Sequence, residues 1–218
     1  MNKGCIFDLD GTLVDSLEDL ALATNRALER LGYQPYPLEK YKMFVGSGVK
    51  KLIERCLPDE TKERQALALD YFYEEYSLCL LEHTKPYLGI EEVLKYLKQQ
   101  GSILAVVTNK PDPLAKKIVS TLFGNLFDEV CGQVEGILVK PDPTLVLQIM
   151  DHYDLDKAKT FYIGDSDVDI YTAKNASLIS IGCTWGNRSE EELVEAGACF
   201  IVHDPKEISK VVCQDDRC

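Results

Sequence analysis

Residues 5–16 of the chain read CIFDLDGTLVDS, a short apolar run followed by two aspartates, a Gly-Thr turn and a third aspartate. The run from Cys5 to Leu9 predicts a buried strand. Side chains alternate faces along a strand, so Asp8 and Asp10 project to the same side near its carboxyl end, where open parallel sheets place their ligands. Two carboxylates held this close repel each other by about 4 kcal/mol in a protein environment. We therefore expect a divalent cation at this strand end, most naturally Mg²⁺.

Further apolar or β-branched runs follow along the chain, and helical patterns separate them. The runs lie at residues 103–107, 161–163, 178–181 and 199–202, each bounded by Gly, Asp, Asn or Thr. Between them, apolar residues recur at the spacing of a helix face, as they do from Ile90 to Leu97. This alternation predicts an α/β fold with a Rossmann-like core and a mostly parallel sheet.

One region breaks the alternation. From about Ser16 to about Thr84 the chain shows helical spacing and no convincing strand. About 70 residues greatly exceed what one crossover between parallel strands needs. We therefore predict two domains, in which residues 1–15 and 85–218 form the Rossmann-like core and residues 16–84 form a smaller, all-helical domain. At the edges, Asp15-Ser16 offers a helix N-cap and Lys85-Pro86 a stiff return to the sheet.

The composition is that of an ordinary folded protein with a strong acidic bias. Among 218 residues, 45% are hydrophobic and 28% are charged, and 24 Lys and Arg face 36 Asp and Glu, a net charge of −12. This charge disfavours nucleic acid and anionic membrane surfaces as partners. Eight scattered cysteines without a CxxC pair are typical of reduced thiols. Because the sequence has no signal-peptide pattern and no membrane-spanning run, we expect a cytoplasmic protein.

The other predicted strands also end in chemically active residues. The strand at 161–163 runs into Gly164-Asp165-Ser166-Asp167-Val168-Asp169, a second acidic loop that could meet the first at the same sheet edge. Ligation by oxygen without histidine suits Mg²⁺ better than zinc. The strand at 103–107 runs into Thr108-Asn109-Lys110, whose hydroxyl and amide can donate hydrogen bonds to phosphoryl oxygens. Lys140-Pro141-Asp142-Pro143 places a cation before a helix, where it would neutralise developing phosphoryl charge.

The order of these segments carries more information than any one of them. Asp8-x-Asp10-Gly11-Thr12, Thr108, Lys140 and Gly164-Asp165-Ser166-x-x-Asp169 resemble, in sequence order, the four motifs of the haloacid dehalogenase-like hydrolase superfamily. The match spans nearly the whole chain, and the helical insertion sits where that superfamily carries its cap domain. The flanking residues, Thr184-Trp185-Gly186 among them, resemble the phosphoglycolate phosphatase group.

The resemblance implies a two-step phosphoryl transfer. It assigns Asp8 as the nucleophile that forms an aspartyl-phosphate, and Asp10 as the acid and then the base. Thr108, with Asn109 beside it, would hold phosphoryl oxygens, and Lys140 would offset charge on the nucleophile and the transferred group. An acid at position 10 favours phosphate esters or anhydrides over carbon–halogen bonds.

The resemblance also implies a magnesium site. Asp8, the backbone carbonyl of Asp10, and Asp165 would hold Mg²⁺. Asp169 would be either a further ligand or a partner for Lys140, while Asp167 is expected outside the ligand set.

Substrate choice would be set by the cap, where Gly46, Ser47 and Gly48 form a glycine loop that leads into a helix. A helix N-terminus with free amide donors suits a carboxylate or a second phosphate. Lys42, Lys50 and Lys51 could add positive charge. We expect a Mg²⁺-dependent phosphatase for a small phosphorylated metabolite, with 2-phosphoglycolate as the first candidate, acting as a monomer or homodimer. Alternatives are a pyrophosphatase, a nucleotide or sugar-phosphate phosphatase, and a β-phosphoglucomutase-like phosphomutase.

Overall fold

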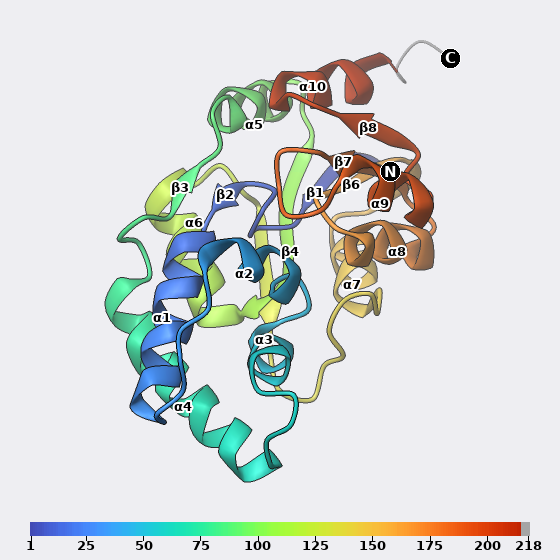
Figure 1. Ribbon diagram of the computed structural model, residues 1–218. Coiled ribbons are helices and arrows are strands. Elements are labelled where there is room, and N and C mark those ends of the chain that lie inside the picture. Colours follow the sequence, from blue (N-terminus) through green and yellow to red (C-terminus); the bar gives the residue numbers. More distant parts are fainter. Residues whose placement is uncertain (215–218) are drawn as a thin grey trace.

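A parallel sheet forms the centre of the molecule in the computed structural model, which describes residues 1–214 (Figure 1). Its strand order is β5-β4-β1-β6-β7-β8, and every neighbouring pair is parallel. The strands are β1 (Asn2–Phe7), β4 (Ile103–Pro111), β5 (Glu129–Gln133), β6 (Leu155–Gly164), β7 (Ile179–Cys183) and β8 (Phe200–Val202). From β1 the chain passes to β4 on one side, and it later returns to β6 on the other side of β1. The strand order therefore reverses at β1. Such a reversal leaves a crevice at the carboxyl end of the strand, the usual ligand position in these sheets.

Helices cover both faces of the sheet, which explains the continuous apolar runs of its strands. On β1, Cys5 and Phe7 belong to one hydrophobic cluster and Ile6 to another. The helices of the sheet domain are α5 (Ile90–Gln99), α6 (Asp112–Phe123), α7 (Thr144–His152), α8 (Asp167–Ala176), α9 (Glu190–Ala196) and α10 (Pro205–Gln214). Residues of α5, α6 and α10 join the cluster of Phe7, and residues of α7 and α8 join the cluster of Ile6.

The predicted parallel core is confirmed, and one strand of its sheet was missed. β5, which reads EVCGQ, lies at the edge of the sheet and is largely half-buried. An edge strand buries less surface than a central one, so its sequence carries little of the apolar pattern that marked the other strands.

Four helices fill the predicted insertion: α1 (Leu17–Arg30), α2 (Leu38–Phe44), α3 (Val49–Cys56) and α4 (Lys62–Cys79), here called the helical unit. A short antiparallel ribbon of β2 (Val14–Asp15) and β3 (Lys85–Pro86) joins this unit to the sheet. Buried residues of the unit and of the sheet form one continuous hydrophobic cluster. The division into domains at residues 15/16 and 84/85 therefore stays a prediction.

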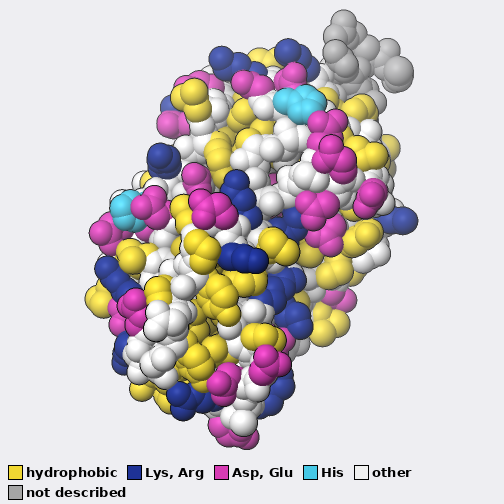
Figure 2. Space-filling view, viewed as in Figure 1, with side chains coloured by type: hydrophobic (Ala, Val, Ile, Leu, Met, Phe, Trp, Pro, Cys, Tyr) yellow, Lys and Arg dark blue, Asp and Glu magenta, His cyan; other side chains and the backbone are white. Residues whose placement is uncertain are grey.

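The surface carries side chains of mixed type, and the described cysteines are unpaired. Acidic, basic and hydrophobic side chains are interspersed over the face shown in Figure 2. The seven cysteines within the described residues are free thiols, and Cys218 lies outside those residues. Within the same part of the chain, none of the helices combines the length and the apolar character needed to cross a bilayer.

Asp19, in the first turn of α1, clasps the two ends of the helical unit together. Its carboxylate is fully buried and accepts hydrogen bonds from the backbone N–H of His83 (2.9 Å) and of Thr84 (2.8 Å). The Thr84 hydroxyl donates a third, at 2.5 Å. These bonds satisfy donors of the returning chain just before β3, where neither sheet nor helix supplies a partner.

We predict that Asp19→Ala lowers the free energy of unfolding by about 3 kcal/mol, because three donors, two of them buried on Thr84, lose a charged acceptor. Urea denaturation followed by circular dichroism measures this change.

Glu18→Ala is the matched control, since Glu18 is the exposed neighbour on the same helix turn. We expect this substitution to change stability by less than about 0.5 kcal/mol. Equal losses in the two variants would show that the clasp contributes nothing beyond the charge near the helix N-terminus.

Candidate active site

The carboxyl edges of the three central strands bring together the residues that the motifs singled out. Asp8 follows β1, Thr108 lies near the end of β4, and Asp165 follows β6. Lys140 reaches the same point from the loop that precedes α7. Register explains this meeting, because Phe7 pairs with Val106 on one side and with Ile163 on the other.

Three buried carboxylates form the centre of the site. Asp8, Asp165 and Asp169 each offer one oxygen, and these oxygens all lie within 4.8 Å of one another. Their residues are between 0% and 5% exposed. Burial raises the pKa of Asp8 to about 6, and the Lys140 ammonium only partly offsets it. Burial, followed by the charges of Asp169 and Asp8, raises the pKa of Asp165 to about 7.

Lys140 is the cation at the centre of this cluster. Its Nζ lies 2.8 Å from Oδ1 of Asp8 and donates a hydrogen bond of 2.7 Å to Oδ1 of Asp169. Burial alone would lower the pKa of this ammonium, but Asp169 and Asp8 raise it well above its ordinary value. The other Asp169 oxygen accepts bonds from the backbone N–H (3.1 Å) and hydroxyl (2.6 Å) of Ser166. Both Asp169 oxygens are therefore engaged, one of them as a partner for Lys140.

Asp165 is fixed by residues far away in the sequence. Its Oδ1 accepts a bond from the Thr12 hydroxyl at 3.2 Å, and its Oδ2 accepts from the backbone N–H (2.7 Å) and side-chain amide (3.0 Å) of Asn187. Asn187, in the loop after β7, was not anticipated from the sequence. Its only signal was its place beside the quoted Thr184-Trp185-Gly186 segment.

The charge balance of the site fits a hard divalent cation. Three carboxylates face one ammonium, and the donors are all oxygens. Oδ1 of Asp8 is buried and accepts no hydrogen bond, since the close Lys140 contact is not aligned as one. Three buried carboxylates that share one ammonium are the kind of oxygen ligand set that a magnesium-like cation prefers.

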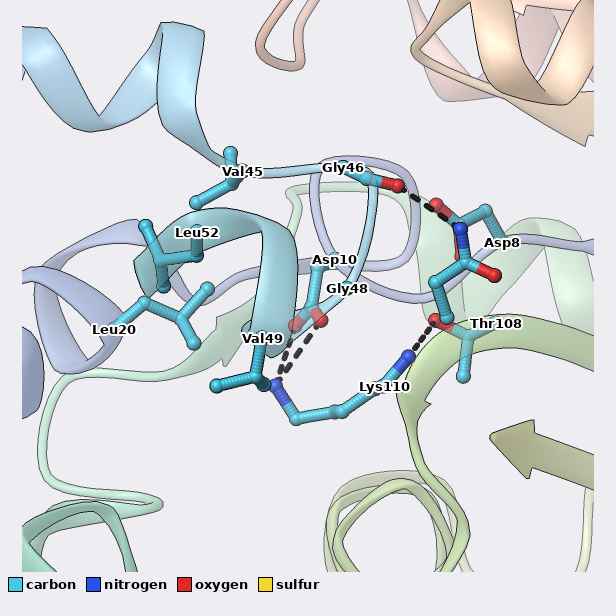
Figure 3. Close-up of a pocket in the computed structure, with 11 residues that line it drawn as sticks. Asp8, Asp10, Leu20, Val45, Gly46, Gly48, Val49, Leu52, Thr108 and Lys110 are labelled. Atoms are coloured by element: carbon cyan, nitrogen blue, oxygen red, sulfur yellow. Dashed lines mark hydrogen bonds and ion pairs between the residues drawn. The ribbon is translucent and has the colours of Figure 1, made fainter. Parts of the chain in front are cut away.

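Asp10 lies in a different environment from Asp8. Its Oδ1 accepts bonds from Ser16 Oγ (2.5 Å) and from Nζ of Lys110 (2.9 Å), as Figure 3 shows for the lysine. Ser16 thus stands at the predicted N-cap position of α1, but its side chain makes no cap hydrogen bond. The hydroxyl serves the site instead of the helix.

Asn109 ties three parts of the site together. Its Oδ1 accepts the backbone N–H of Lys140 at 2.8 Å, and its Nδ2 donates to the carbonyls of Lys140 (3.2 Å) and Gly46 (3.3 Å). The β4 end, the lysine loop and the glycine loop of the helical unit are therefore joined by one side chain.

The glycine loop reaches the site with two of its three residues. Gly46 and Gly48 have φ of 103° and 86°, which favour glycine, and both line the cavity beside Asp8. Ser47 lines a neighbouring cavity and accepts a bond from Arg55 at 3.1 Å. The candidate lysines 42, 50 and 51 do not line the Asp8 cavity.

Arg188, from the loop after β7, is a second residue that the sequence did not reveal. Its guanidinium donates to the carbonyls of Lys42 and Val45 at the end of α2, the latter at 3.1 Å. Together with Asn109, it holds the helical unit against the sheet edge.

The cavity itself is small and has two kinds of wall. Its volume is about 40 Å³. One wall is polar and comes from the sheet, and the other is apolar and comes from the helical unit, as Figure 3 shows. Its lining residues are Asp8, Asp10, Leu20, Val45, Gly46, Gly48, Val49, Leu52, Thr108, Asn109 and Lys110.

Comparison with known proteins finds close relatives over most of the chain. A family model for haloacid dehalogenase-like hydrolases matches residues 5–183. The phosphoglycolate phosphatase of Aquifex aeolicus is 36% identical over 182 residues, covering 83% of this chain and 84% of that protein. The phosphoglycolate phosphatase of Psychrobacter arcticus is 37% identical over 191 residues, covering 83% of both. The crystal structure of a predicted phosphoglycolate phosphatase from Haemophilus somnus has a TM-score of 0.90 and 30% identity, covering 96% of this chain and 97% of that chain.

Gly164 lets the Asp169 side chain pack directly against the backbone at the end of β6, and this generates a prediction. A Cβ at position 164 would overlap Cβ and Cγ of Asp169. We expect Gly164→Ala to displace Asp169 and to lower the free energy of unfolding by about 1–3 kcal/mol, as overpacking does. Chemical denaturation measures the loss.

Gly182, the strand partner of Gly164 on β7, supplies the control. Its added Cβ would lie 3.0 Å from Ile201 Cδ1 and 3.3 Å from Leu193 Cδ1, both ends of flexible side chains. We expect Gly182→Ala to cost less than about 1 kcal/mol. A Gly164→Ala protein as stable as the parent would contradict the close packing described here.

Proposed function

Because the chain belongs to the haloacid dehalogenase-like hydrolases, we propose that it is a phosphatase for small phosphate monoesters and that 2-phosphoglycolate is its substrate. One observation carries the mechanism: an Asp8 oxygen without a hydrogen bond lies beside a buried ammonium and two further carboxylates. Such an oxygen can attack phosphorus, and the lysine ammonium can stabilise the negative charge that develops on the phosphoryl group.

The reaction then has two steps. In the first, Asp8 attacks phosphorus in line, the ester P–O bond breaks, and Asp10 gives its proton to the leaving alcohol oxygen. In the second, water attacks the aspartyl-phosphate, Asp10 takes the proton of that water, and the bond between phosphorus and Asp8 breaks to release phosphate. Splitting one difficult displacement into two suits a carboxylate nucleophile.

The surrounding groups hold the transferred phosphoryl group. Lys140 stays charged in its buried position and faces both the nucleophile and the phosphoryl oxygens. Thr108 and the backbone beside it offer hydrogen-bond donors at the same strand end. Asn109 holds the loop of Lys140 and the glycine loop next to each other through its three hydrogen bonds to Lys140 and Gly46.

We assign Mg²⁺ to the carboxylates of Asp8 and Asp165 and to the backbone carbonyl of Asp10. When bound, the ion would supply positive charge to the phosphoryl oxygens and relieve the repulsion between the carboxylates. Asp169 serves in this assignment as the partner of Lys140, because both its oxygens already accept hydrogen bonds.

The choice of substrate rests on the two relatives and on the shape of the cavity. Phosphoglycolate phosphatases are 36% and 37% identical to this chain and are matched over most of their length. The apolar wall of Leu20, Val49 and Leu52 leaves room for a small leaving group only. A cavity of about 40 Å³ holds a few waters at most. We therefore propose that residues 16–84 act as a cap that moves away from the sheet to admit the substrate.

We predict Mg²⁺-dependent phosphate release, fastest with 2-phosphoglycolate, from a panel that also contains pyrophosphate, nucleoside monophosphates and hexose phosphates. Asp8→Asn should lower kcat by at least about 1,000-fold, because an amide cannot form the intermediate. Release of inorganic phosphate in a colorimetric assay, with Mg²⁺ or with EDTA, measures both effects.

Thermal unfolding of the Asp8→Asn protein serves as the folding control. A better substrate from another class would replace phosphoglycolate and leave the mechanism intact. Isomerisation of a hexose phosphate with little free phosphate would make the protein a phosphomutase. Activity that survives in Asp8→Asn would eliminate Asp8 as the nucleophile.

A second prediction concerns the cation. Asp165→Asn removes one of the proposed carboxylate ligands, so we expect the Mg²⁺ concentration for half-maximal activity to rise by at least about tenfold. The matched control is Asp167→Asn, since the Asp167 side chain is 45% exposed and lies two residues away. Titration of activity with MgCl₂ distinguishes them, and equal behaviour of the two variants would rule out Asp165 as a ligand.

A further inference from the structure

Lys110 is a buried lysine at the catalytic end of β4 for which the mechanism above gives no role. Its side chain is 2% exposed. Among the residues that line the cavity beside Asp8, it is the only lysine or arginine (Figure 3). A buried ammonium must be paired, and its partners show what it does.

The three N–H donors of Lys110 all have acceptors. Nζ donates to Oδ1 of Asp10 at 2.9 Å, to Oδ2 of Asp10 at 3.1 Å, and to the Tyr76 hydroxyl at 2.6 Å. Burial alone would lower the pKa of this lysine, but Asp10 and Tyr76 raise it above its ordinary value. The ammonium thus contacts both oxygens of one carboxylate.

Tyr76 fixes the lysine from the side of the helical unit. It lies on α4, is fully buried, and stacks on Phe72 with ring centroids 5.1 Å apart. Its hydroxyl therefore has a defined position, and the Lys110 ammonium also lies 4.8 Å from the centre of its ring. Tyr76, Lys110 and Asp10 form a chain that runs from α4 to the end of β1.

We propose that Lys110 is a positioning residue that sets the direction of the Asp10 carboxyl group, and that Tyr76 couples this direction to the seating of the helical unit on the sheet. The inference rests on the proposed function, in which Asp10 is the acid for the leaving oxygen. A carboxyl group anchored through both oxygens can deliver its proton along one path only. Without the anchor it would sample other rotamers and miss the leaving oxygen.

This role predicts a dependence on the leaving group. The alkoxide of glycolate is a strong base and needs the proton of Asp10 as the ester bond breaks, whereas nitrophenolate leaves without one. Loss of the anchor should therefore slow the first step for 2-phosphoglycolate and hardly affect the first step for 4-nitrophenyl phosphate.

The experiment compares Lys110→Met with the parent in single turnovers at saturating Mg²⁺ and excess enzyme. Ester consumption is followed by rapid quench and nitrophenolate release by stopped flow. We expect the single-turnover rate with 2-phosphoglycolate to fall by about 50-fold, its KM from steady-state phosphate release to stay within about threefold, and the rate with 4-nitrophenyl phosphate to fall by less than about threefold. Lys95→Met, at an exposed lysine paired with Glu91, is the matched control and should change neither rate.

A second variant keeps the inference testable if Lys110→Met is poorly folded. Tyr76→Phe removes only the hydroxyl that holds the lysine, so we expect the same pattern in weaker form, about 3–10-fold with 2-phosphoglycolate. Tyr73→Phe, an exposed position on the same helix, is its control.

Several results would overturn the inference. Equal losses with both esters would indicate a general structural role, and unchanged rates would indicate no role. A rise in KM for 2-phosphoglycolate at an unchanged rate would make Lys110 a binding group for the carboxylate of the substrate. A parent enzyme that hydrolyses neither ester would refute the proposed function, and this inference with it, whatever the variants do.

Discussion

Repulsion between buried carboxylates is the constraint on which the rest of this structure depends. Asp8, Asp165 and Asp169 bring three oxygens within 4.8 Å of one another in a site almost closed to water. Lys140 neutralises only part of this charge, and the pKa of Asp8 and of Asp165 stays raised, to about 6 and about 7. Positive charge stabilises a site with this excess of negative charge. The Lys140 ammonium supplies part of that charge, and a bound metal ion would supply more.

The fold holds the charges together by rigid means. Asp8 extends β1, the strand at which the order of the sheet reverses, and apolar clusters on both faces of the sheet hold that strand. Gly164 and Gly186 allow the backbone to approach Asp169 and Asp165 more closely than any side chain would permit. Hydrogen bonds from Ser166 and Asn187 then fix the orientation of these carboxylates. Hydrophobic packing on both faces of the sheet thus stabilises the strands that hold the mutually repelling carboxylates together.

The helical unit is held to the sheet by polar contacts at its base and at the mouth of the site. Asp19 and the β2–β3 ribbon hold its base with buried or backbone hydrogen bonds. At the mouth of the site, Asn109 donates to the carbonyl of Gly46, and Arg188 donates to the carbonyls of Lys42 and Val45. Lys110 adds a buried hydrogen bond to Tyr76 of α4, so the unit is attached both at its base and over the catalytic groups.

The sequence by itself determined the parallel core, the helical insertion and the strand-end motifs, because alternation and helical spacing are local patterns. The edge strand β5 was not predicted, because it buries too little surface to show such a pattern. Tertiary structure alone decided which side chains of the site hydrogen-bond to one another. Ser16 stands where a helix cap is expected and bonds to Asp10, and Lys110, two residues after Thr108, joins Asp10 to Tyr76 of a distant helix. Such contacts depend on how separate elements pack, and no local pattern records that.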